Sequence, residues 1–174
     1  MFFDFTYAAF DHFCAQSAHM PVFALSDYLS RTTLPPLPYL ILRIDVGHMH
    51  ALDLARIASW HSLRASFYFQ DASPDAMHAV SALGHEVMTE APAGINFAQL
   101  TYLSDIGGYW HLYDFYQPRQ RGRRTSLRAV LRDSFHPHSA LYVHFHTDYW
   151  FPRPWNLFSF RLRRLRQFRQ LQAD

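Results

Sequence analysis

Residues 39–50, YLILRIDVGHMH, decide the fold class of this chain. The stretch begins as a run of apolar and β-branched residues, the pattern of a parallel strand with helices on both faces. The run reaches Asp45 near its end, and His48 and His50 follow directly. A carboxylate and two imidazoles this close together indicate a metal site, half of a catalytic pair, or only the polar end of a strand.

Strand and helix patterns alternate on either side of residues 39–46. We predict helices over 4–18, 26–30, 51–63 and 73–84, and further strands over 22–24, 64–70 and 85–89. Ser26 and Ser73 are the predicted N-caps, and Gly84 is the predicted helix end. This alternation is typical of parallel βαβ units, so the predicted fold class is α/β.

The carboxyl ends of the predicted strands carry polar side chains. Asp45, Gln70 and Glu90 lie at three such ends, and parallel strands bring these ends to one rim. The second half of the chain is less regular. It predicts a strand with a glycine turn over 99–110, a helix over 125–135 capped by Thr125, a buried strand over 140–146 ending at His146, and a basic amphipathic helix over about 155–172.

Composition narrows the class of protein. At 174 residues with 49% hydrophobic residues, the chain is predicted to form one domain with a real core. It has no apolar run near the roughly 20 residues that cross a bilayer, and residues 1–13 lack a basic leader region. The single Cys14 excludes an internal disulfide and a multi-cysteine zinc site, and a buried thiol is expected. These features favour a cytoplasmic protein.

The charges divide the chain into two parts. Residues 1–118 hold 4 Arg against 11 acidic residues, and residues 119–174 hold 12 Arg against 3 Asp. The basic helix at the end has its apolar stripe at Leu162, Leu165 and Phe168. It either packs this stripe on the domain or meets an anionic membrane surface through residues 158–169, and nucleic acid is not the favoured partner.

Several motifs together resemble the polysaccharide deacetylase (NodB-homology) superfamily, and more narrowly its small bacterial members found among cell-surface polysaccharide genes. They occur in the order FALSDYL (23–29), YLILRIDV (39–46), ARIASWHSLRASFYFQ (55–70), SALGHEV (81–87), LSDIGGYW (103–110) and ALYVHFHTDYW (140–150). The resemblance implies a distorted (β/α) barrel over about 23–150. It also implies metal-dependent removal of acetyl groups from N-acetylated sugars or polysaccharide precursors.

The resemblance implies roles for particular residues. Asp45 matches the catalytic base and His146 the catalytic acid, whereas Gly47 stands where the family has its metal-binding aspartate. Replacement ligands for a divalent metal, zinc by preference, are hypothesised at Glu90, His48 and His50. The alternatives are that His48 and His50 are exposed loop residues and that Glu90 is a surface or groove carboxylate.

The remaining matches concern substrate and packing. The resemblance implies that Asp105, Tyr109 and Trp110 line the sugar groove. The alternatives are that Asp105, beside two glycines, shapes a turn and that the aromatic rings form a lid over the core. His85 and Glu86 are interpreted as packing residues. Two functions follow: a carbohydrate deacetylase, or a catalytically inactive relative that binds a glycan or a protein in the same groove.

Overall fold

The computed structural model describes residues 5–47, 50–71, 73–90, 95, 100–105, 110–114, 123–125, 140–147 and 150, with the backbone path alone over 110–114 and 123–125. The described residues contain four α-helices, which all come before residue 83. They are α1 (Tyr7–Ser17), α2 (Leu25–Leu29), α3 (Ala51–Trp60) and α4 (Pro74–Ala82). None of the described helices is long and apolar enough to cross a membrane.

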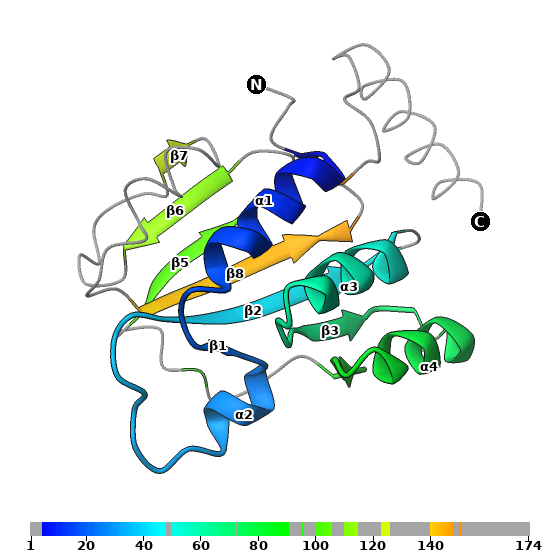
Figure 1. Ribbon diagram of the computed structural model, residues 1–174, viewed down its shortest axis with the longest axis horizontal. Helices are drawn as coiled ribbons and strands as arrows, with labels where there is room; N and C mark the ends of the chain where they lie inside the picture. The colour runs from blue at the N-terminus through cyan, green and yellow to red at the C-terminus, as the bar shows by residue number, and fades with distance from the viewer. Residues whose placement is uncertain are drawn as a thin grey trace.

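The strands of the described residues form one sheet (Figure 1). They are β1 (Val22–Phe23), β2 (Tyr39–Val46), β3 (Ser66–Phe69), β4 (Glu86–Met88), β5 (Thr101–Ser104), β6 (Trp110–Asp114), β7 (Arg123–Thr125) and β8 (Ala140–His146). Their order is β4-β3-β2-β8-β5-β6-β7, with β1 also paired to β2. The pairs from β4 to β5 are parallel, and β5-β6-β7 are antiparallel. The predicted α/β class is therefore confirmed as a mostly parallel sheet.

The described strands leave β4 at one end of the sheet and β7 at the other. Closure into a barrel, which the resemblance implies, stays a prediction. The helix predicted over about 155–172 and the one predicted after Thr125 lie outside the described residues.

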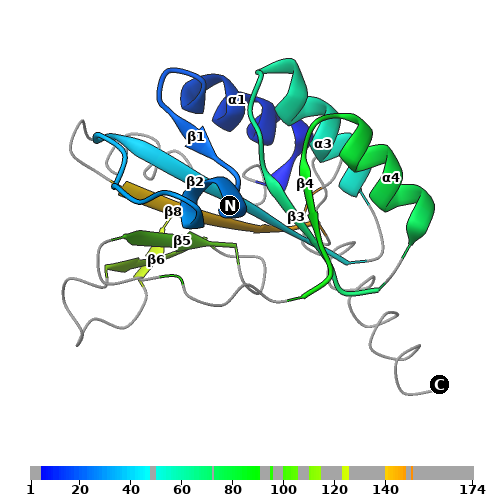
Figure 2. The ribbon, with the colours of Figure 1, turned by 90° about the horizontal axis from the view of Figure 1, so that it is seen from below.

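One face of the sheet carries the main core. Helices α1, α3 and α4 all lie on this face (Figures 1 and 2). Successive side chains of a strand point to opposite faces, so alternate residues of β2 meet these helices. They are Leu40, Leu42, Ile44 and Val46, which pack in one apolar cluster with Leu141, Val143 and Phe145 of β8. Here the apolar run of β2 does what the sequence predicts.

Among the described residues, a helix covers only part of the opposite face of β2. Near the start of the strand, Tyr39 and Ile41 pack with Leu25 and Tyr28 of α2. Further along, the same face of β2 carries Arg43 and Asp45. Among the described residues this end of the face has no helix over it, and polar side chains take the place of an apolar layer.

The structure confirms some of the predicted helix ends and not others. The predicted N-cap Ser26 lies inside α2, whose N-cap position is Ala24, two residues earlier, and the Ser26 backbone N–H donates a hydrogen bond to Glu86. Ser73 does occupy the N-cap of α4, but its side chain makes no capping hydrogen bond. Gly84, with φ of +86°, follows α4 as predicted, since glycine adopts this left-handed conformation without strain. Thr125 lies in β7.

Candidate functional site

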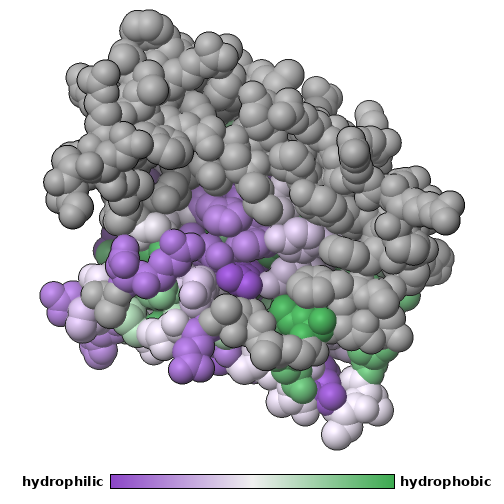
Figure 3. Space-filling view, turned by 180° about the vertical axis from the view of Figure 1, so that it is seen from behind, coloured by the Kyte–Doolittle hydropathy of each residue, from purple (hydrophilic) through white to green (hydrophobic). Residues whose placement is uncertain are grey.

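The carboxyl ends of β2 and β8 bring two predicted site residues together. The strands pair in parallel along their whole length, and Asp45 is the register partner of His146. The preceding residues on the same face, Arg43 and His144, are also register partners. The four side chains therefore form a square on the face away from α1, α3 and α4. Figure 3 views this side of the molecule and shows hydrophilic side chains gathered near its middle.

Arg43 holds Asp45 through both carboxylate oxygens. Its Nε lies 2.5 Å from Oδ1 and its terminal nitrogen 2.9 Å from Oδ2. The guanidinium also lies 5.1 Å from the centre of the Tyr68 ring on β3, in a cation–π contact. Burial alone would raise the pKa of Asp45, but contacts with His144 and Arg43 outweigh it and the pKa is lowered. Asp45 is therefore a buried, ionised carboxylate.

His144 connects Asp45 to the next strand. Its Nε2 lies 2.9 Å from Oδ2 of Asp45, and its Nδ1 lies 2.7 Å from the hydroxyl of Tyr102 on β5. The residue is only 8% exposed, and burial lowers its pKa despite the nearby carboxylate of Asp45. The neutral imidazole is thus the favoured form, and a neutral ring has one nitrogen available as an electron-pair donor.

His146 is held by a second carboxylate, that of Asp105. This side chain is fully buried just after β5, and its Oδ1 lies 2.5 Å from Nδ1 of His146. Its Oδ2 accepts hydrogen bonds from the His146 backbone N–H (3.1 Å) and from the Trp150 indole (2.8 Å). Burial alone would lower the pKa of His146, but the hydrogen bond and charge of Asp105 raise it. Asp105 therefore fixes the ring through Nδ1 and sets the direction in which Nε2 points.

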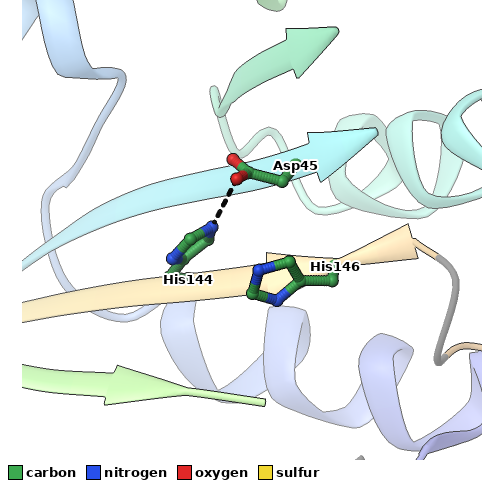
Figure 4. Close-up of side chains that lie close together, drawn as sticks. All are labelled: Asp45, His144 and His146. Atoms are coloured by element: carbon green, nitrogen blue, oxygen red, sulfur yellow. Dashed lines mark ion pairs between the residues drawn. The ribbon is translucent and has the colours of Figure 1, made fainter. Parts of the chain in front are cut away.

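Three side chains of this group converge on one point. Asp45, His144 and His146 each offer one donor atom, and these atoms all lie within 4.8 Å of one another. Figure 4 shows the carboxylate and both rings on adjacent strands, with a nitrogen of each ring turned toward Asp45. One carboxylate and two imidazoles are a donor set that zinc and related divalent metals accept. These residues therefore fit the metal that the resemblance implies.

The hypothesised metal ligands lie elsewhere or outside the described residues. His50 is at the N-cap of α3, where its Nδ1 lies 2.5 Å from the Tyr7 hydroxyl, and its backbone has a positive φ of 72°. Glu90 is an exposed residue beyond the end of β4. Within the described part of the chain, neither belongs to a group that could hold a metal. His48 is outside the described residues.

Of the three predicted groove residues, Asp105 alone has a described side chain. Asp105 is in the site, but it contacts His146 and Trp150 from inside the protein and has no exposed surface for a sugar. Trp110 starts β6, of which the backbone alone is described, and Tyr109 is outside the described residues. His85 is buried between Ser59 and the Ala55 carbonyl, which agrees with its predicted packing role.

Arg43, His144 and Tyr102 are site residues that the sequence reasoning missed. A signal for two of them was present, because side chains two residues apart on a strand share a face. Arg43 precedes Asp45 by two residues, and His144 precedes His146 by two. Tyr102 and His144 are 42 residues apart in the chain, so no local pattern in the sequence predicts their contact.

Comparisons of this chain with protein-family models, with curated proteins and with solved structures find no match.

Proposed function

We propose that this chain is a hydrolase that removes acetyl groups from N-acetylated sugars or polysaccharide precursors. In this reaction water adds to the amide carbonyl and the C–N bond breaks, which leaves acetate and the free amino sugar. The observation that carries the proposal is the register of Asp45 and His146 on adjacent parallel strands. These are the two positions that match the family's catalytic pair.

The surroundings of this pair support the proposal. Asp45 is ionised and oriented by Arg43, and His146 is oriented by a buried carboxylate. Such buried, mutually perturbing ionisable groups are typical of catalytic sites. The set serves amide hydrolysis in either of two ways: as a proton acceptor and donor, or as ligands of a divalent metal that polarises the carbonyl and acidifies water.

Acetate release from a panel of N-acetylated oligosaccharides tests the proposal, with the purified chain supplied with zinc. We expect Asp45→Asn and His146→Gln each to lower kcat/KM by at least about 100-fold. Asp75→Asn and His78→Gln make the same chemical changes at exposed positions of α4 and should keep full activity. Equal activity in all four variants would refute the assignment of this site.

One observation favours a second function, that of a catalytically inactive relative that binds a glycan. Both oxygens of Asp45 accept hydrogen bonds from Arg43, and this ion pair makes the carboxylate a weaker base and a weaker metal ligand. The acetate assay separates the two functions when it is combined with calorimetry on the same oligosaccharides. Saturable binding without acetate release, with or without zinc, would favour the binding module.

A further inference from the structure

We infer that Asp45, His144 and His146 form a divalent metal centre on this chain, with Nε2 of each histidine and one oxygen of Asp45 as ligands. None of its three members is among the ligands hypothesised from the sequence, which were Glu90, His48 and His50. It also goes beyond the proposed function, since a metal can bind here whether or not a sugar is deacetylated.

The contact between His144 and Asp45 is the first argument. The two atoms lie 2.9 Å apart, yet Nε2 of His144 makes no hydrogen bond of acceptable geometry and has less than 1 Å² of exposed surface. A buried ring nitrogen without a hydrogen bond is costly. Two ligands of one metal, each bonded at roughly 2.0–2.2 Å, lie at about this separation without pointing at each other. A cation shared by the two atoms would satisfy both.

The partners of the two rings are the second argument. A histidine that binds metal through one nitrogen almost always donates the other N–H to a carboxylate, a carbonyl or water, which fixes the ring and its tautomer. Nδ1 of His146 lies 2.5 Å from Asp105, and Nδ1 of His144 lies 2.7 Å from the Tyr102 hydroxyl. Each ring therefore has an outer partner at Nδ1 and can offer Nε2 to a metal, and in Figure 4 one nitrogen of each ring lies on the side toward Asp45.

The setting of the centre is the third argument. Asp45 and His144 are 6% and 8% exposed, so water screens little of their interaction with a bound cation. Both strands that carry the ligands lie in the middle of the sheet and pair along seven residues, which fixes the ligand positions before any metal arrives. Such preorganisation strengthens binding because little order remains to be imposed.

The positive charge of Arg43 lowers the expected affinity of this site for a metal cation. Its guanidinium partly neutralises Asp45 and lies beside it on the same strand. A cation must share Asp45 with this positive charge, so the centre should hold its metal less tightly than a closed structural zinc site does. Three protein ligands leave coordination positions open, which is the arrangement of catalytic rather than structural zinc.

Titration of the full chain with zinc by calorimetry, after treatment with a chelator and dialysis, tests the inference without any substrate. We expect one equivalent of zinc to bind with defined affinity to the unaltered protein. His144→Gln should weaken this binding by at least 100-fold, and Tyr102→Phe, which removes only an outer partner, by about 10- to 100-fold. His78→Gln is the matched control and should bind as the unaltered protein does.

A second readout guards against loss of folding and against weak binding by other histidines. Cobalt bound by Asp45, His144 and His146 should give visible absorption bands that disappear when zinc is added. The His144→Gln variant should lack these bands, while the far-ultraviolet circular dichroism of this variant stays native. No zinc equivalent, or an equivalent unchanged in His144→Gln and lost in His50→Gln, would overturn the inference. Metal binding without acetate release would refute the proposed hydrolase alone.

Discussion

Replacing Asp105 with asparagine tests how the site is built from inside the protein. The Asp105 carboxylate is fully buried and accepts three hydrogen bonds, two from His146 and one from the Trp150 indole. Asparagine has the same shape, but one of its two terminal atoms is an NH2 group. An NH2 group in the place of Oδ2 would face two donors, and one in the place of Oδ1 would face the His146 ring unless the ring gives up its Nδ1–H.

The cost follows from the number of donors left without an acceptor. An unsatisfied buried donor costs about 1–3 kcal/mol, and one or two of the three are affected. We therefore expect Asp105→Asn to lower the free energy of unfolding by about 1–6 kcal/mol. His146 should also lose its fixed orientation, and zinc affinity should fall by about 10- to 100-fold.

Urea unfolding with a chelator present isolates the stability effect from metal binding. Asp27→Asn is the matched control, because Asp27 forms a two-oxygen ion pair with Arg64 at the surface. Exposed pairs of this kind contribute only about 0–1 kcal/mol. If Asp105→Asn cost no more than Asp27→Asn, Asp105 would not be the buried acceptor of three bonds, and the reasoning would fail.

Three further predictions concern the rest of the molecule. Phe67→Ala removes a fully buried ring from the main core and should cost about 3–5 kcal/mol in urea unfolding, whereas a loss under 1 kcal/mol would show that the core is not packed as described. Cys14 is buried, and its pKa is raised mainly by burial and further by the charge of Asp11. A thiol reagent at pH 8 should therefore react with Cys14 only as fast as the protein opens, and immediate labelling of the folded protein would contradict this. Burial lowers the pKa of His85, and the charge of Arg64 lowers it further, so neutral His85 contributes stability that is full above pH 6.5 and is lost as the pH falls through its folded pKa. His85→Gln should flatten this part of the plot of unfolding free energy against pH, and an unchanged slope would refute the assignment.

Much of the fold was predictable because local patterns and burial agree. The apolar runs at residues 39–46 and 140–146 are strands with the predicted bounds, and helix α4 begins at the predicted Pro74 and ends at Ala82, shortly before Gly84. The order of the strands was not available from such patterns. The insertion of β8 between β2 and β5 joins residues about 100 positions apart in the chain, and only the resemblance bears on contacts of that range.

The site was predictable in part for the same reason. Asp45 and His146 stood out as polar ends of buried strands, and parallel pairing then placed them side by side. The alternation within each strand also places Arg43 on the face of Asp45 and His144 on the face of His146. His50 shows the opposite case, because its left-handed backbone at the start of α3 puts its ring against Tyr7. Proximity in sequence to Asp45 could not reveal that turn.

A crystal of the unaltered protein soaked in zinc, with anomalous diffraction recorded at the zinc edge, tests the central claim most directly. The metal centre predicts one strong anomalous peak bounded by Asp45, His144 and His146, with Asp105 and Tyr102 behind the two rings. A peak at Glu90 or His50 instead, or no peak at the ends of β2 and β8 in a crystal that holds zinc elsewhere, would contradict it.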